Sequence, residues 1–260
     1  MTIPDVSRRT LLARTSALVG TAALITLPGS ALLATPAYAA DNSHSRTPTG
    51  EEIREAYRRF QKNRTRVHTG KPSSNGWEME KTEDGGGSIS SRPVPGTPLT
   101  GISVRTGDVE TVLVHVVRRF HYEIGELRKG DVIGWRSPGT VRKGLPEGNQ
   151  ASGTAVQIRP GFYPSGTKGG FFPTQLVVVR DILAELDGVV RWSGDDRHAD
   201  ESLFYIDVKP GDARLAAVAN KIRTWQATPG EGAGAPVDVL ATGRRKAAEN
   251  LRRLQQRTAA

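Results

Sequence analysis

The sequence predicts an α+β domain in which a small antiparallel sheet packs with helices. Several segments place apolar residues at the three- and four-residue spacing of an amphipathic helix, and others are short apolar runs that suit strands. These elements follow one another without a regular strand-helix-strand order, which favours an α+β fold over a doubly wound parallel sheet. With 260 residues, 37% of them hydrophobic, the chain has enough apolar material for one sizeable core and a small annex.

The composition excludes several classes of site. Cysteine is absent, which excludes a disulfide framework, a zinc ribbon, an iron–sulfur cluster and thiol catalysis. A metal site would therefore have to use carboxylates and the five histidines. The chain is basic, with 36 lysines and arginines against 27 acidic residues and a formal charge of +9, which favours an anionic partner.

Residues 1–39 are predicted to be an export signal and not part of the fold. An arginine pair at residues 8–9 precedes an apolar run at residues 17–27 that is too short to span a bilayer. Residues 37–39 read AYA, the small-x-small pattern of a signal-peptidase site, so cleavage is expected before Ala40. The segment resembles a twin-arginine signal, which implies export across the cytoplasmic membrane by that route.

An exported, basic protein without cysteine is expected in the cell wall or the medium. Its predicted partner is peptidoglycan or another anionic polymer of the cell wall, and nucleic acid is not expected there. No transmembrane span is expected after cleavage of the signal. The alternative is that the segment stays attached as an N-terminal membrane anchor, and the oligomeric state stays open.

Residues 40–103 are predicted to hold one helix and a long loop. The stretch 49–52 has capping-box spacing and starts the helix. The apolar residues that then fall at helical intervals are Ile53, Ala56, Tyr57 and Phe60. Residues 71–98 are rich in Gly, Ser and Pro and show no sustained period, which predicts a long surface loop.

Residues 104–226 are predicted to form the main domain. Three helices are expected, the first capped by Asp108, the second started by Pro173 and the third capped by Asp212. Short strands are expected at residues 131–135, 154–158, 189–192 and 203–208. A charged loop, GDDRH at residues 194–198, lies between the last two strands. Its charges are interpreted either as solvated side chains or as a substitute metal site.

Residues 227–260 are predicted to be a linker followed by a basic helix. Residues 228–236 are rich in Gly, Pro and Ala. A weak apolar stripe then runs beside six cations, and its members are Leu240, Ala247, Leu251 and Leu254. Such a helix either lies on an anionic surface or is a solvated terminal helix.

Two stretches resemble the M15 metallopeptidases, the zinc D-alanyl-D-alanine carboxypeptidases and phage endolysin peptidases that cut peptidoglycan stem peptides. Residues 148–157 read GNQASGTAVQ, similar to the family signature Ser-x-His-x-x-Gly-x-Ala-x-Asp. Residues 187–195 read DGVVRWSGD, similar to the Asp-Gly-Val-Val-Arg-Trp-Gly-Gly-Asp of many members. The resemblance covers residues 104–208 and implies an M15-like domain there.

The resemblance also identifies the three positions that hold zinc in the family, and all three are substituted. Gln150 stands at the first histidine, Gln157 at the aspartate and Leu203 at the second histidine. Asp200 matches the general base best, and Glu201 is the near alternative. Zinc prefers imidazole, thiolate or carboxylate, whereas an amide is a weak neutral donor and leucine has no lone pair. The sequence therefore predicts no cofactor and loss of the zinc-dependent activity, because water without the ion keeps its pKa of about 15.7.

The cleft that holds zinc in the resembling family is nevertheless expected to bind a peptide here. Gln150, Ser152 and Gln157 are candidate substrate contacts, and the resemblance implies an arginine for the peptide carboxylate, here Arg136 or Arg142. The predicted function is that of a pseudoenzyme that binds a stem peptide or another wall component. The alternatives are an active wall peptidase that uses substitute ligands, and a structural protein whose cleft is filled by side chains.

Overall fold

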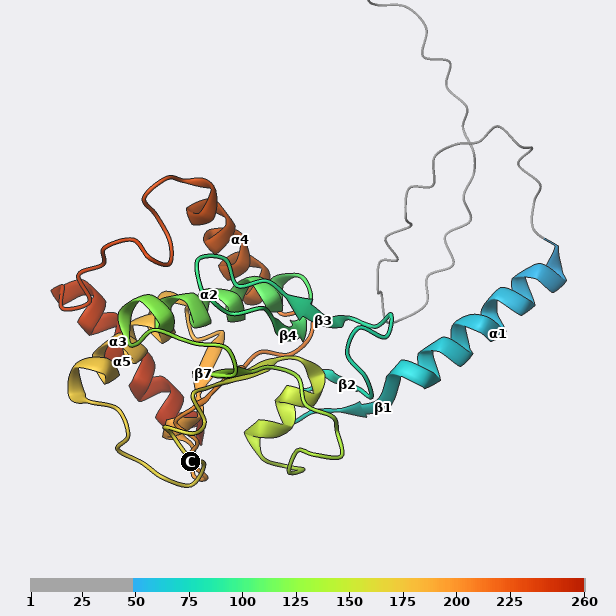
Figure 1. The fold of residues 1–260 in the computed structure, drawn as a ribbon, viewed down its shortest axis with the longest axis horizontal. Coiled ribbons are helices and arrows are strands. Elements are labelled where there is room, and N and C mark those ends of the chain that lie inside the picture. Colours follow the sequence, from blue (N-terminus) through green and yellow to red (C-terminus); the bar gives the residue numbers. More distant parts are fainter. Residues whose placement is uncertain (1–48, 260) are drawn as a thin grey trace, which may run out of the picture. The chain divides into compact units, whose positions relative to one another are not determined.

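The computed structural model describes residues 49–259, which fold as an α+β protein with small antiparallel sheets, as predicted (Figure 1). The predicted export signal lies outside the described residues. The helices are α1 Gly50–Val67, α2 Asp108–Glu123, α3 Pro173–Glu185, α4 Ala213–Ala227 and α5 Thr242–Ala259, with short 3-10 helices η1 Pro146–Ser152 and η2 Ser193–Asp195. The strands are β1 His68–Pro72, β2 Glu78–Glu80, β3 Ile89–Arg92, β4 Ile102–Arg105, β5 Val132–Ile133, β6 Ala155–Ile158, β7 Val190–Trp192 and β8 Leu203–Ile206.

The main sheet has four antiparallel strands in the order β5-β6-β8-β7, close to the predicted strand positions. Successive side chains of a strand point to opposite faces, so β6 and β8 each contribute to both. The face that belongs to the main core carries Val156, Ile158, Phe204 and Ile206. The opposite face carries Ala155, Gln157, Leu203 and Tyr205.

Helix α2 is the centre of the core. Its fully buried side chains are Val112, Leu113, Val116, Val117 and Phe120. It packs against α3 and α4, both of which begin where the sequence predicts. The predicted cap of α2 is wrong, because Gly107 is the N-cap and Asp108 is the first helical residue. Gly107 has φ +88°, which glycine adopts without the steric cost that other residues incur.

The predicted loop at residues 71–98 is wrong in part, because it contains short strands. β1 pairs with β2, and β3 pairs with β4. Strands of three to five residues are too short to show an alternation of apolar and polar side chains, so their positions depend on pairing with a neighbouring strand. The turn after β1 also contacts the main sheet, since Asn75 Nδ2 donates to Thr154 Oγ1 and to the Ile206 carbonyl, each at 2.8 Å.

Helix α5 packs along α3, and of the predicted apolar stripe only Leu251 is packed against the core (Figure 1). Leu240 and Leu254 are 63% and 53% exposed, whereas Gln255 is buried and Leu251 is partly buried against the core. Polar contacts determine which face of α5 is turned toward the protein, because Arg244 pairs with α3 and Gln255 Nε2 donates to the Val190 carbonyl. None of the helices between residues 49 and 259 combines the length and the apolar character that a bilayer span requires.

Candidate functional site

The three positions that correspond to zinc ligands in the resembling family come together at one end of the main sheet. Gln157 on β6 lies directly opposite Leu203 on β8, and Ile133 on β5 lies opposite Gln157 on its other side. Gln150 reaches the same place from η1, since its Nε2 donates to the carbonyls of Ile133 at 3.2 Å and Gly134 at 2.9 Å. We call this group of Gln150, Gln157, Leu203 and the neighbouring Asp200 the inherited site, a label that refers only to the resemblance described above.

Local geometry fixes the approach of η1 to β6. Gly153 ends η1 with φ +68°, and a Cβ there would lie 2.7 Å from the Arg105 backbone nitrogen. Only glycine fits both the conformation and the close approach. The chain turns at Gly153, so Gln150 lies in η1 before the turn and Gln157 lies in β6 after it.

The inherited site is buried, and within it Gln157 bonds to Asp200. Gln150, Leu203 and Asp200 are at most 3% exposed, and Gln157 is 7% exposed. Gln157 Nε2 donates to Asp200 Oδ2 at 2.9 Å. Asp200 Oδ1 accepts from the backbone N–H and the hydroxyl of Ser202. The carboxylate that matches the general base is therefore held by neutral donors inside the protein.

The donor set of the inherited site does not fit a zinc ion. It consists of two neutral amides, one carboxylate and a leucine that packs with Ala155 and Tyr205 in a small apolar cluster. Among residues 49–257, no group of three or more His, Cys, Asp or Glu side chains is arranged to hold a metal. Gln150 Oε1 accepts no hydrogen bond from the described residues, so the amide is satisfied on one side only.

The acidic loop after β7 is occupied by structural ion pairs. Both Asp195 oxygens accept from Arg180 of α3. Asp196 pairs with Arg191 and accepts from the Tyr205 hydroxyl. His198 is exposed. The sequence predicts either solvated charge or a substitute metal site for this loop, but Asp195 and Asp196 are instead largely buried in ion pairs with arginines.

Each of the two candidate arginines has a partner of its own within the chain. Arg142 is 60% exposed in its side chain and binds Glu147 through Nε at 2.9 Å and Nη2 at 2.8 Å. The hydrogen bond and charge of Glu147, with a smaller contribution from Asp200, raise the pKa of Arg142, and the hydrogen bond from Arg142 lowers the pKa of Glu147 despite its burial. Arg136 Nη2 donates to the Thr140 carbonyl at 2.9 Å. The Arg142 guanidinium is thus committed to a carboxylate of its own chain.

Ser152 is also committed inside the protein. It is fully buried, and its hydroxyl lies 2.8 Å from both Ser73 Oγ and Thr154 Oγ1. It also donates to the Asn149 carbonyl at 2.9 Å. The hydroxyl therefore joins the turn after β1 to η1.

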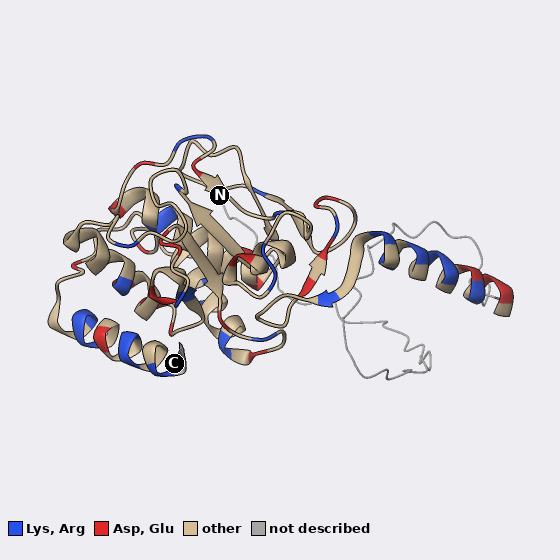
Figure 2. Cartoon of the chain, turned by 90° about the horizontal axis from the view of Figure 1, so that it is seen from below, with Lys and Arg blue, Asp and Glu red and all other residues tan. Residues whose placement is uncertain are grey.

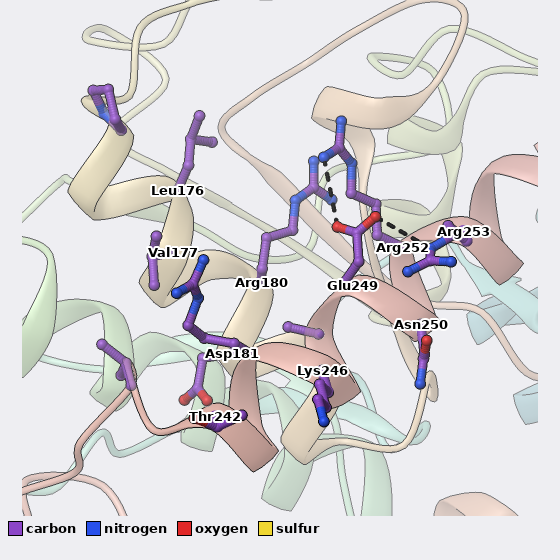
Figure 3. A pocket seen from close by; sticks show the side chains of 14 residues that line it. Leu176, Val177, Arg180, Asp181, Thr242, Lys246, Glu249, Asn250, Arg252 and Arg253 are labelled. Carbon is purple, nitrogen blue, oxygen red and sulfur yellow. Dashed lines mark hydrogen bonds and ion pairs between the residues drawn. The ribbon is translucent and has the colours of Figure 1, made fainter.

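A second concave surface lies between α3 and α5, and we call it the α3–α5 groove (Figure 3). Its volume is about 740 Å³. Leu176 and Val177 of α3 form an apolar side, and the exposed cations at its α5 side are Arg245, Lys246, Arg252 and Arg253. Glu249 is the one acidic residue of α5 at the groove, and it pairs with both Arg252 and Arg253. A neighbouring hollow of about 790 Å³ shares Asn250 and Arg253 and adds Arg257.

The groove is the surface that sequence reasoning missed. The six cations of residues 244–257 are visible in the sequence, but the groove requires the packing of α5 against α3. The sequence signal was the spacing of Arg245, Arg252 and Arg253 with Glu249, which places these charges on one helical face.

The geometry thus separates a closed inherited site from an open basic groove. Comparison with known proteins adds no assignment to either. No protein-family model matches the chain, and neither a curated protein nor a solved structure is significantly similar to it.

Proposed function

We propose that this chain is an exported protein that keeps an M15-peptidase-like scaffold without its zinc site. It binds an anionic component of the cell wall and does not cleave it. The observation that carries the proposal is the set of neutral, buried side chains at the inherited site. Gln157 bonds to Asp200 there, Gln150 and Gln157 are neutral amides that bind zinc weakly, and Leu203 has no lone pair, so none of the three is a ligand of the kind that zinc catalysis needs.

The α3–α5 groove supports binding of an anionic polymer better than the inherited site does. Gln150, Ser152 and Gln157 are buried, and Arg142 is paired with Glu147. By contrast, the α3–α5 groove is open and has four exposed cations, of which Arg252 and Arg253 share the single carboxylate of Glu249, and Arg245 and Lys246 add two more positive charges. Arginine and lysine bind phosphate and carboxylate groups, so successive anionic groups of a polymer match successive cations of α5.

Binding is tested by sedimentation of the protein with purified sacculi. Sacculi that retain their phosphate polymers are compared with the same sacculi after acid extraction. Lys246→Glu with Arg253→Glu is expected to weaken binding by about tenfold or more, because it reverses two charges that line the groove. Arg128→Glu with Lys129→Glu makes the same charge change on an exposed loop and is the matched control.

The outcomes separate the possible ligands. Equal binding by the two double variants contradicts the groove, and protein that stays in the supernatant contradicts wall binding. Binding that survives extraction, is competed by soluble muropeptides and is lost in Arg142→Ala assigns the ligand to a stem peptide at Arg142.

Loss of the zinc site is tested by elemental analysis of the dialysed protein. The native chain is expected to hold no zinc, whereas Gln150→His, Gln157→Asp and Leu203→His together are expected to create a zinc site. Equimolar zinc in the native chain, or chelator-sensitive release of D-alanine from muropeptides, identifies a working peptidase instead. A folded triple variant that stays free of zinc shows that the three positions are not equivalent to the family's ligands.

A further inference from the structure

Helix α1 exposes an apolar stripe that no described part of the chain covers. Apart from Gln61 and Val67, every residue of α1 is exposed. Ile53, Tyr57 and Phe60 are 57%, 62% and 50% exposed. Their spacing of four and three residues places them in one row along the helix.

The charges of α1 are divided along its length. Its three acidic residues, Glu51, Glu52 and Glu55, lie in the first two turns. The rest of the helix carries no acid and contains Arg58, Arg59, Lys62, Arg64 and Arg66. Figure 2 shows this division as red at the start of the helix and blue along the rest. The surface around Tyr57 and Phe60 therefore combines aromatic groups with a strong positive charge.

Local contacts form α1 before any partner binds. Thr49 and Glu52 make a complete capping box, and Gln61 Nε2 donates to the Tyr57 hydroxyl at 2.8 Å. At the other end, Arg66 donates to the Gly85 carbonyl at 2.8 Å, and Lys81 Nζ donates to the Thr65 carbonyl at 2.6 Å. A partner of α1 therefore meets an ordered helix and does not have to supply the free energy of helix formation.

We propose that α1 docks on the surface of an anionic lipid bilayer, with Ile53, Tyr57 and Phe60 in the acyl boundary and its cations at the lipid phosphates. An amphipathic helix with aromatic and aliphatic residues on one face and arginines and lysines around it has the character of a membrane-surface helix. A hydrated wall polymer matches the charges but offers nothing apolar to the stripe. A second copy matches the stripe but brings together two helices that each carry six cations against three acids. The lipid surface is the partner that matches both properties.

The absence of cysteine allows a local test in the full chain. Tyr57→Cys, on the stripe, and Lys62→Cys, on the charged side, each receive an environment-sensitive dye. With vesicles of phosphatidylglycerol and phosphatidylcholine, the dye at residue 57 is expected to shift to the blue and the dye at residue 62 is not. Pure phosphatidylcholine vesicles are expected to give no shift, and added salt is expected to weaken the response because it screens the lipid charge.

A second set of variants tests the stripe itself. With the dye at residue 57, Ile53→Gln and Phe60→Gln are expected to raise the lipid concentration for the half-maximal shift by about 30-fold. Phe162→Gln with Phe172→Gln is the matched control, since both side chains are 71% exposed elsewhere on the chain. An unchanged concentration in the stripe variant, or equal responses at residues 57 and 62, overturns the proposal.

The remaining outcomes identify other occupants of the stripe and also overturn the proposal. A blue shift without vesicles that grows with protein concentration assigns the stripe to a second copy. A blue shift without vesicles at every concentration assigns it to a segment of the same chain. The inference is independent of the proposed wall-binding function, because the α3–α5 groove and α1 share no residue.

Discussion

Helices α1 and α5 are alike in sequence but differ in how the fold uses them. Each has 18 residues and six cations. α5 lies along α3 and buries part of one face, whereas α1 has only Val67 buried. An amphipathic pattern therefore predicts that a helix forms and which side is apolar, but it does not show whether the partner of that side belongs to the same chain.

The attachment of α5 depends on charge as well as on apolar contact. Arg244 binds Asp181 and Glu185 of α3, with Nε 2.6 Å from Asp181 Oδ1 and Nη2 2.7 Å from Glu185 Oε2. The same two carboxylates bind the buried Arg119 of α2, and Glu185 also lies 2.7 Å from His115 Nε2. Three helices are thus joined by one buried network, and α1 has no contact of this kind among the described residues.

The largest expected effect is the loss of the Arg244 charge. Arg244→Met keeps the aliphatic stem but leaves the buried Asp181 and Glu185 with one cation fewer, which is expected to destabilise the protein by about 3 kcal/mol. Arg58→Met removes an exposed charge from α1 and is expected to change stability by less than about 0.5 kcal/mol. Urea denaturation of both variants measures the difference. Similar urea midpoints for the two variants would show that the ion pairs of Arg244 do not stabilise the protein more than an exposed charge of α1 does.

The second effect is a dependence of stability on acid. Burial raises the pKa of Glu185, but the hydrogen bonds from His115 and Arg244 and the charge of Arg119 outweigh it and lower this pKa to about 2. Because this lies below the ordinary value of 4.5, ionised Glu185 stabilises the folded state above pH 4.5, and the contribution is lost as pH falls toward 2. It amounts to about 3 kcal/mol, and the acid-induced loss is expected to be smaller in Arg244→Met than in Arg58→Met. Denaturation series between pH 7 and pH 2.5 test this, and parallel curves for the two variants would contradict it.

These contacts explain which parts of the fold the sequence predicts. The helices begin close to their predicted starts because caps and Pro173 act locally. The predicted stripe of the C-terminal helix holds only in part, because Arg244, a cation, pairs with carboxylates of α3 that are distant in sequence. Leu254, an apolar residue, is left exposed for the same reason.

The inherited site shows the same limit. The resemblance identified Gln150, Gln157 and Leu203 from the sequence. In the fold, the pairing of β6 with β8 places Gln157 opposite Leu203, and Gln150 of η1 bonds to the neighbouring strand β5. Their burial depends on the whole sheet and on Ser202 holding Asp200, which no local pattern reports. The groove depends on the docking of α5 and was beyond prediction for that reason.

A third prediction compares apolar side chains on the two helices. Leu251 of α5 packs against the core, and its Cδ1 lies close to Gly188. Leu251→Ala is expected to cost about 1–2 kcal/mol, because partly buried apolar surface becomes exposed. Ile53→Ala on α1 is expected to cost less than about 0.5 kcal/mol, since Ile53 is already 57% exposed. Equal costs, measured by denaturation without lipid, would indicate that the stripe of α1 is covered in solution.

The smallest effect on global stability is expected from the cap of α1. The Thr49 hydroxyl accepts from the Glu52 N–H at 3.3 Å, and Glu52 accepts from the Thr49 N–H at 2.6 Å. Thr49→Ala removes the first of these bonds at a local cost of about 1 kcal/mol. Because α1 packs on little else, this cost is expected to appear as faster amide hydrogen exchange in the first turns of α1, with an unchanged denaturation midpoint. Asp212→Ala removes the side-chain cap of α4, which buries Leu215 and Val218, and there the midpoint is expected to fall. A fall in the midpoint of Thr49→Ala as large as that of Asp212→Ala would mean that α1 unfolds together with the core.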